Sequence, residues 1–354
     1  MSQAEAEPKS MKVTMQMIAE AVGVSRGTVD RAIHHRGRID PEVEARIFQA
    51  ARSMGYTLPG GEGVRPEKSD AKREIRIGVV TYLCNAGFMR EINRGITEAR
   101  EELRERGVMV FLRESEAVDE KQQLAFLEEL EQMGMDALAI MPIDTGAIRK
   151  KLYALSEKEI PLVMFNSKLS GIPRLSYVGM DNYQSGRAAA GLMNMLTGGE
   201  GRLLVITGSF GNQLINARVD GFTKEIKDSF PQLSVVAVQS SYDSSKEVQR
   251  IIEDSMRNIP GINGIFVVSS GQAGIREAFS TLQPDRRPYV VIYDQTPKNE
   301  KLLRDDLADF LIDQSGYEQG YRPLHILANA VGRGILPERK EEHTEISIRT
   351  KYNL

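Results

Sequence analysis

The chain has 354 residues, of which 41% are hydrophobic and 27% are charged, which is typical of a globular protein rather than a disordered or fibrous one. The length predicts two or three folded units. A net charge of −3 gives no overall attraction to nucleic acid, so any such binding requires a local basic patch. The single cysteine, Cys84, excludes an internal disulfide and a Cys-rich zinc module, and it suits the reducing cytoplasm.

The first residues show no targeting signal. Residues 1–11 lack the short apolar core of a secretory signal, and we expect them to be disordered. No later stretch holds about 18 consecutive apolar residues, the length needed to cross a membrane as a helix. The sequence therefore predicts a cytoplasmic protein without a membrane partner.

Residues 12–57 have the pattern of a small three-helix unit that begins with a helix-turn-helix. Ala19 is small enough for two helices to cross closely, and Gly23 can take the positive φ of a tight turn. Ser25 is expected to cap the second helix. Asp40 as a cap and Gly55 as a stop indicate a third helix.

The second helix of this unit is predicted to read DNA bases from its first turns. Arginine there binds guanine through paired donors. Between Lys12 and Arg38, five Lys and Arg residues against two acidic ones provide the local positive charge. The adjacent His34 and His35 cannot share a helical face, so they are interpreted as phosphate contacts or solvated residues rather than metal ligands. The candidate DNA-binding residues are Thr14, Ser25, Arg26, Gly27, Thr28, Arg31 and His35.

Residues 58–74, with the sequence LPGGEGVRPEKSDAKRE, are predicted to form a flexible linker, because glycines and prolines interrupt any apolar period. Beyond it, near-continuous apolar runs alternate with amphipathic segments over 75–354. This alternation predicts a doubly wound parallel sheet, and the length of about 280 residues favours two lobes. We expect one lobe over about 75–181 and 315–340, and the other over about 182–314 and 341–354.

Enzyme signatures are missing from this sequence. No G-x-G-x-x-G follows residues 75–81, and neither a phosphate loop nor an H-E-x-x-H motif occurs. The sequence therefore predicts a protein that is not an enzyme and that holds no cofactor or metal. Ligands of doubly wound sheets bind at the carboxyl ends of the strands.

The segment 13–56, VTMQMIAEAVGVSRGTVDRAIHHRGRIDPEVEARIFQAARSMGY, resembles the DNA-binding headpiece of the LacI/GalR family of transcription regulators. The remainder resembles that family's effector domain, and more closely the ribose-type periplasmic sugar-binding proteins, through IGVV, IPLVMFN, VGMDN, ARVDGF, YDQTP and LIDQSGYEQG. The resemblance implies an all-α helix-turn-helix headpiece followed by an α/β, two-lobed effector domain of the type I periplasmic-binding-protein kind. It also implies a homodimeric repressor that binds a palindromic operator and changes affinity when a small sugar-like effector closes the cleft.

The resemblance further implies the residues of the effector site. Phe88 and Tyr242 take the positions of aromatic side chains that stack on a sugar ring. Arg218 corresponds to an arginine that binds sugar hydroxyls, Asp294 to a carboxylate acceptor, and Gln314 to an amide that donates and accepts.

Two departures from the ribose-type pattern alter the expected ligand. Asn166 and Ser167 replace an Asp–Arg pair, with Asn166 kept as an effector-binding candidate, and Ser269–Ser270 replaces an Asn–Asp pair. The loss of two carboxylates and an arginine argues against ribose itself and favours another sugar or derivative. A nucleoside, a purine or a signalling furanose stays open as the effector. A sugar-binding protein without DNA function and an enzyme are the less favoured alternatives.

The linker also departs from the family, which commonly folds this segment into a helix that enters the minor groove. The glycines and prolines of 59–66 oppose a helix here. Asp181 and Asn182 in VGMDN are interpreted mainly as a helix cap near a crossover between the lobes.

Overall fold

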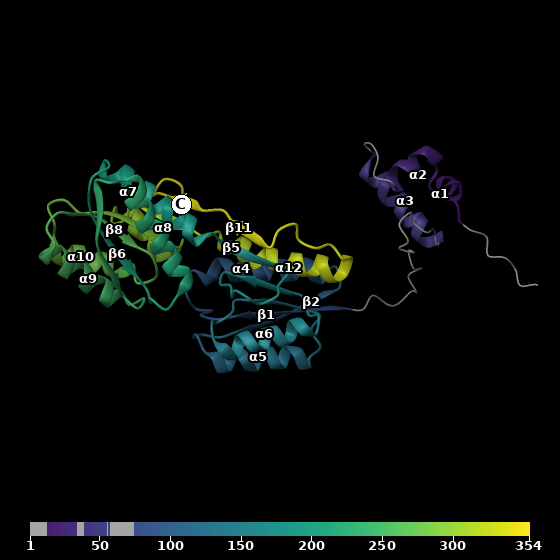
Figure 1. Cartoon of the computed structure of the whole chain (residues 1–354), viewed down its shortest axis with the longest axis horizontal. Coiled ribbons are helices and arrows are strands. Elements are labelled where there is room, and N and C mark those ends of the chain that lie inside the picture. Colours follow the sequence, from purple (N-terminus) through teal and green to yellow (C-terminus); the bar gives the residue numbers. More distant parts are fainter. Residues whose placement is uncertain (1–12, 34–38, 55, 57–73) are drawn as a thin grey trace, which may run out of the picture. The chain divides into compact units, whose positions relative to one another are not determined.

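The computed structural model describes residues 13–33, 39–54, 56 and 74–354, and the chain divides into two units, Met1–Arg73 and Glu74–Leu354 (Figure 1). The segment predicted to be disordered, the histidine pair His34 and His35, and all of the predicted linker except Glu74 lie outside the described residues.

The described residues of the first unit form three helices, α1 (Met15–Val22), α2 (Arg26–Ile33) and α3 (Pro41–Met54), as the sequence predicted. Helix α1 ends at Gly23, whose φ of 76° confirms the expected left-handed turn. Ile18, Val29 and Ile47, one from each helix, are fully buried against one another in the small core. This core sets the angle between α1 and α2.

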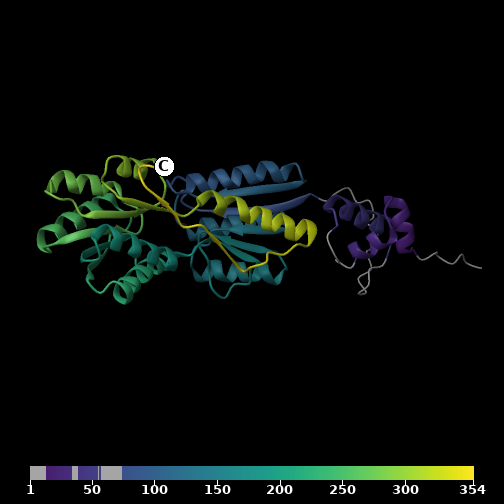
Figure 2. The same cartoon turned by 90° about the horizontal axis from the view of Figure 1, so that it is seen from above.

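The second unit holds two six-stranded sheets. The first sheet has the strand order β11-β5-β4-β3-β1-β2, and all of its pairings are parallel. Its strands are β1 (Ile75–Thr81), β2 (Val108–Glu114), β3 (Ala137–Ile140), β4 (Leu162–Phe165), β5 (Ser176–Met180) and β11 (Glu341–Thr344). Helices α4 (Met89–Arg104) and α12 (Gly316–Arg333) cover one face, and α5 (Glu120–Gln132) and α6 (Gly146–Glu157) cover the other (Figure 1; seen from above in Figure 2).

The second sheet repeats this plan with the order β12-β10-β9-β8-β6-β7. Its strands are β6 (Gly201–Thr207), β7 (Leu233–Ser240), β8 (Ile262–Val267), β9 (Tyr289–Tyr293), β10 (Phe310–Asp313) and β12 (Ser347–Arg349), of which β12 runs antiparallel to β10. Helices α7 (Asn182–Thr197) and α8 (Gln213–Ser229) pack on one face, and α9 (Ser245–Asn258), α10 (Ala273–Leu282) and α11 (Pro297–Arg304) pack on the other. The predicted two-lobed, doubly wound architecture is confirmed.

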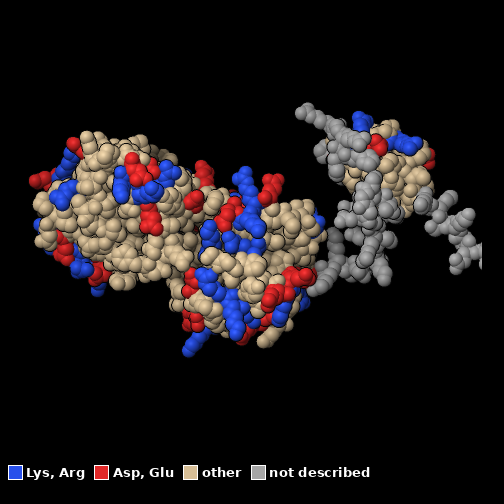
Figure 3. Space-filling model, in the orientation of Figure 1, with Lys and Arg blue, Asp and Glu red and all other residues tan. Residues whose placement is uncertain are grey.

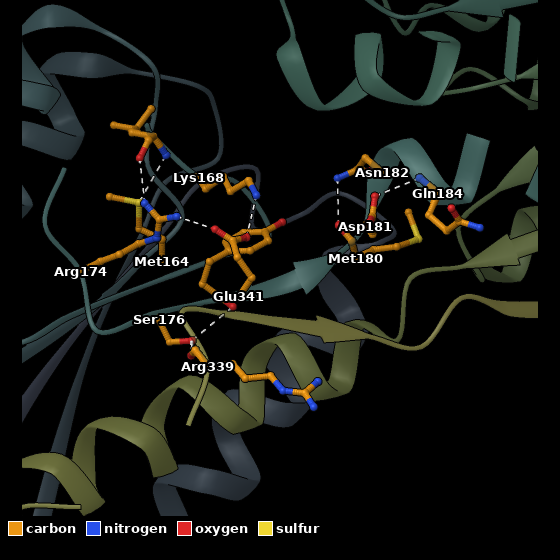
Figure 4. Close-up of polar contacts among 12 residues, drawn as sticks. Met164, Lys168, Arg174, Ser176, Met180, Asp181, Asn182, Gln184, Arg339 and Glu341 are labelled. Atoms are coloured by element: carbon orange, nitrogen blue, oxygen red, sulfur yellow. Dashed lines mark hydrogen bonds and ion pairs between the residues drawn. The ribbon is translucent and has the colours of Figure 1, made fainter. Parts of the chain in front are cut away.

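The chain crosses between the two sheets three times, after β5, after β10 and after β11. The sequence placed the last crossover near residue 341, but β11 still belongs to the first sheet, where Glu341 lies opposite Tyr177. The Glu341 carboxylate accepts hydrogen bonds from Lys168 at 2.7 Å and from Arg174 at 2.6 Å (Figure 4). These bonds hold residues 341–344 on the first lobe, so the crossover follows Thr344.

Paired helices in each lobe touch backbone to backbone at glycines. A β-carbon at Gly320 would lie 2.0 Å from the Ile92 carbonyl oxygen of α4, and one at Gly186 would lie 2.0 Å from the Arg218 carbonyl oxygen of α8. Only glycine permits such an approach, so these positions fix how closely α12 lies on α4 and α8 on α7.

We expect Gly186→Ala to destabilise the protein by about 1–3 kcal/mol, because the added methyl group forces α7 and α8 apart. Gly191→Ala on the same helix is the matched control: nothing lies within 4 Å of its β-carbon, so alanine there should stabilise by about 1 kcal/mol through helix propensity. Urea unfolding followed by circular dichroism measures both. Equal midpoints for the two variants would contradict the close-contact interpretation.

Candidate functional site

Helix α2 presents an exposed polar face at its start. The Ser25 hydroxyl accepts a hydrogen bond from the Thr28 amide at 3.1 Å, which confirms Ser25 as the cap of this helix. Arg31 folds back along the first turn, where Nε donates to the Gly27 carbonyl at 3.2 Å and Nη2 to the Thr28 hydroxyl at 3.4 Å. Arg26 is exposed beside them, and the opposite face, with Val29, is buried.

Two of the candidate DNA-binding residues therefore also hold helix ends. Thr14 caps α1 by accepting from the Met17 amide, and Ser25 caps α2. Gly27 has no side chain, so the outer face of α2 is open at this position. A β-carbon there would meet only the Ser25 hydroxyl, at 3.8 Å. The outer face of α2 thus combines a hydroxyl, two arginines and room for close approach, which are the features of a helix that enters the major groove. His35, the remaining candidate, lies outside the described residues.

A pocket opens between the two lobes of the second unit, at the carboxyl ends of β4, β9 and β10. Four of the six effector-binding candidates line it: Phe88, Asn166, Asp294 and Gln314. The other lining residues, which sequence reasoning did not single out, are Glu91, Ile92, Gln295, Asp313, Gly316 and Gln319. The structure thus brings together side chains that lie more than 200 residues apart in the chain.

Arg218 lies directly behind this pocket rather than in its wall. The side chain is buried, with Nε donating to the Asn182 Oδ1 at 2.7 Å and Nη2 to the Gln314 Oε1 at 2.7 Å. Nη1 donates to the Val268 carbonyl at 3.2 Å, and the guanidinium stacks 4.1 Å above the ring of Tyr293. Burial raises the pKa of Tyr293 to about 12, so Arg218 faces a neutral ring. Arg218 therefore acts on the pocket through Gln314.

Two wall residues have left-handed backbone conformations that turn the chain at strand ends. Asn166 has φ of 59° and Asp294 has φ of 71°, and both are residue types that tolerate this region. The Asp294 carboxylate accepts a hydrogen bond from the Gln314 amide; burial raises the pKa of this carboxyl, and the nearby Arg218 partly offsets that rise. On the other lobe, the Asn166 Nδ2 donates to the Gln319 Oε1 at 3.0 Å.

Asn166 is held by a tyrosine that sequence reasoning missed. The Tyr177 hydroxyl donates to the Asn166 carbonyl at 2.9 Å, and it lies over Gly179, where a β-carbon would be 2.2 Å from that hydroxyl. A tyrosine in an apolar strand has the pattern of a core residue, so the only available signal was the glycine two positions later. Ser167 points away from the pocket, since its hydroxyl donates to the Pro142 carbonyl at 3.0 Å.

Tyr242 is not in the pocket wall, although the family resemblance assigned it a stacking role. Its side chain is 74% exposed at the carboxyl end of β7. Tyr242 and Asp243 both have positive φ, and the Asp243 carboxylate accepts from the Ser269 hydroxyl and from the Ser270 amide at 3.0 Å. Ser269 and Ser270 thus anchor the turn that follows β7.

Comparisons with known proteins agree with this arrangement. Residues 14–58 match the family model of bacterial regulatory proteins of the lacI family, and residues 77–334 match that of the periplasmic binding protein domain. The chain belongs to the lacI family of bacterial regulatory proteins. It is a DNA-binding transcription regulator that joins the helix-turn-helix to a periplasmic-binding-protein-like domain. Neither matched family is a family of enzymes.

The relatives of this regulator include both regulators and sugar-binding proteins. The maltose regulon regulatory protein MalI of Escherichia coli (strain K12) is 27% identical over 258 residues, or 72% of this chain and 71% of that protein. The ribose import binding protein RbsB of Bacillus subtilis (strain 168) is 27% identical over 231 residues, or 65% of this chain and 73% of that protein. AraP, an arabinose binding protein from Geobacillus stearothermophilus, superimposes with a TM-score of 0.71 at 25% identity over 79% of this chain and 98% of AraP.

Several other features of the regulator bear on its partners. On the drawn face of the second unit, basic side chains lie next to acidic ones (Figure 3). None of the helices in the described ranges has the length and apolar character needed to span a membrane. The same residues contain no group of three His, Cys, Asp or Glu side chains placed to hold a metal ion.

We expect Arg26→Ala to weaken binding to a selected operator by about 1–3 kcal/mol, with a smaller loss on scrambled DNA, because an exposed arginine at the start of α2 can reach a guanine. Fluorescence anisotropy at one salt concentration measures both affinities. Lys246→Ala, which removes an exposed positive charge from the second unit, is the control. Equal losses on both DNAs would reassign Arg26 to a phosphate contact.

Proposed function

We propose that this regulator is a cytoplasmic repressor whose operator affinity is controlled by a sugar or sugar derivative bound between the two lobes. The observation that carries the proposal is a pocket walled by aromatic, amide and carboxylate side chains from both lobes. A ribose import binding protein and a maltose regulon regulatory protein among the relatives support the same class of ligand. Binding, rather than catalysis, is the role of this pocket.

The pocket wall matches the chemistry of a sugar. The half-buried ring of Phe88 offers a flat surface for the C–H face of a pyranose or furanose. The Asp294 carboxylate accepts hydrogen bonds from hydroxyls, and the side-chain amides of Asn166, Gln314 and Gln319 both donate and accept. A hydroxyl-rich ligand can satisfy all of these groups at once.

The same residues connect the pocket to the crossovers between the lobes. Arg218 joins Asn182, just after the first crossover, to Gln314 at the second. The Gln314 carbonyl accepts from the Thr344 hydroxyl at 3.0 Å, at the third crossover, and from the Gln319 amide at 2.8 Å. A ligand that binds Gln314 therefore acts on all three connections, and a difference in its affinity for two lobe arrangements shifts their populations.

We also propose that the regulator binds its palindromic operator as a homodimer. The two copies meet along the edge of the first sheet. Strand β2 is an edge strand, and with α4 it borders a groove that includes Arg100, Glu101, Val108, Met109 and Val110. An apolar edge strand is normally covered, and neighbouring charges of both signs on α4 suit a two-fold contact. Two headpieces are needed to read a palindrome.

We expect Met109→Arg to convert the dimer to a monomer, because the variant places a charge in the proposed interface. Sedimentation velocity measures the change. Met195→Arg, at a methionine of α7 that is 67% exposed, introduces the same residue outside the groove and should leave the dimer intact. A Met109→Arg protein that stays dimeric would place the interface elsewhere.

The effector role of the pocket is tested by adding D-ribose, D-arabinose or maltose to the regulator on its selected operator. We expect one of these sugars to change operator affinity, and Arg218→Ala to reduce that response at least tenfold while operator affinity without sugar is unchanged. The reason is that Gln314 and Asn182 lose their shared partner. Arg202→Ala is the control, because Arg202 lies at the start of β6 and the pocket lies at the carboxyl ends of the strands. An unchanged sugar response in Arg218→Ala would remove this arginine from the effector pathway.

A further inference from the structure

The charged groups in the pocket wall are all acidic. Glu91, Asp294 and Asp313 contribute carboxylates, and none of the described residues that line the pocket is a lysine or an arginine. A ligand between the two lobes thus meets carboxylate oxygens that accept hydrogen bonds. It also meets side-chain amides that both donate and accept hydrogen bonds.

Arginines close to these wall residues face protein oxygens, although the buried Nε of Arg349 has no hydrogen-bond partner in the part of the chain that the structure describes. Each of the three guanidinium nitrogens of Arg218 donates to a protein oxygen. Arg94 pairs with Glu91 at 2.7 Å, and Arg349 lies 3.9 Å from Asp313. These arginines are not among the described residues that line the pocket, so the wall itself gives an anionic ligand no counter-charge.

We propose that the effector is an uncharged polyhydroxyl compound, such as a free sugar or a cyclitol, and that the pocket rejects phosphate esters. This inference rests on the proposed role of the cleft as the effector site. A phosphate dianion has no hydrogen to donate to the three carboxylates and would enter a desolvated site without a paired cation. A hydroxyl group donates to a carboxylate and accepts from an amide, so it fits this wall.

The electrostatics of the carboxylates agree with this choice. Burial raises the pKa of both Asp294 and Asp313, which shows that negative charge is already costly at this place. A cationic ligand is not required either, because Glu91 and Asp313 have arginine partners and Asp294 accepts from the Gln314 amide near Arg218.

The test uses the full-length protein and matched pairs of compounds: D-ribose and D-ribose 5-phosphate, D-arabinose and D-arabinose 5-phosphate, and maltose and maltose 6′-phosphate. Thermal shift identifies the pairs that respond, and calorimetry gives their affinities. We expect the neutral member of a responding pair to bind at least 100-fold more tightly than its phosphate. A phosphate that binds as tightly as its neutral partner, or more tightly, overturns the inference.

A polar-metabolite extract of bacterial cells tests for effectors outside these pairs. One half of the extract is treated with alkaline phosphatase before it is added to the protein. We expect the stabilisation of the protein by the extract to survive the treatment. Stabilisation that disappears with the phosphates overturns the inference, and so does the absence of any response to both the pairs and the extract.

The source of the discrimination is tested with Asp294→Asn, which removes a carboxylate charge and keeps the shape of the side chain. We expect the preference for the neutral member of a responding pair to fall at least tenfold. Asp285→Asn, at an exposed position in the same lobe, removes the same charge and should leave the preference unchanged. Asp313→Asn is the second variant if Asp294→Asn does not fold, and an undiminished preference in the folded variant overturns the electrostatic argument.

Operator binding separates this inference from the proposed function. A neutral sugar that binds without changing operator affinity contradicts the proposed function and leaves the ligand class standing. A phosphate ester that binds and changes operator affinity contradicts the ligand class and leaves the proposed control of operator affinity standing.

Discussion

A buried guanidinium must find acceptors for its hydrogen bonds, and Arg218 finds them in Asn182, Val268 and Gln314. These three residues belong to the first crossover, to the end of β8 and to the second crossover. Leaving the charge unpaired in this environment would cost several kcal/mol, so the crossovers are tied to the core of the second lobe. The pocket wall depends on this arginine, because Gln314 is both its acceptor and a lining residue.

Close helix contacts keep Arg218 in position. Helix α8 carries it, and α8 lies directly on α7 at Gly186 and Gly221, where no side chain separates the two backbones. Helices α4 and α12 of the first lobe meet in the same way at Gly95 and Gly320. Such contacts make each lobe resist deformation. The connections between the lobes are therefore the parts of this unit where a ligand can most readily alter the structure.

The helical unit shows a similar double use of residues. Thr14 and Ser25 are candidates for DNA contact, and their hydroxyls also cap α1 and α2. A cap residue lies at the exposed start of its helix, which is the part of a recognition helix that approaches the phosphates and bases. Stability and recognition therefore select the same residue types at these positions.

The sequence by itself determined the helix-turn-helix and the alternation of strands and helices, and its resemblance to ribose-type binding proteins supplied four candidates that line the pocket. Apolar periodicity is a local property, and Asn166, Asp294 and Gln314 each directly follow a strand, whereas Phe88 directly precedes α4. Apolar periodicity could not predict β11, because its sequence EEHT has no apolar run. Strand β11 forms because its backbone pairs with the edge of β5 and because Lys168 and Arg174 bind Glu341.

Only the tertiary structure decided which side chains meet. The contact of Gln319 with Asn166 spans 153 residues, and that of Arg218 with Asn182 crosses from α8 to the first crossover. The direction of Tyr242 depends on two successive positive φ angles, which residue types do not reveal. Spacing along a chain specifies which face of an element a residue occupies, but hydrogen-bond partners are chosen by the packing of elements distant in sequence, and that packing is a property of the whole fold.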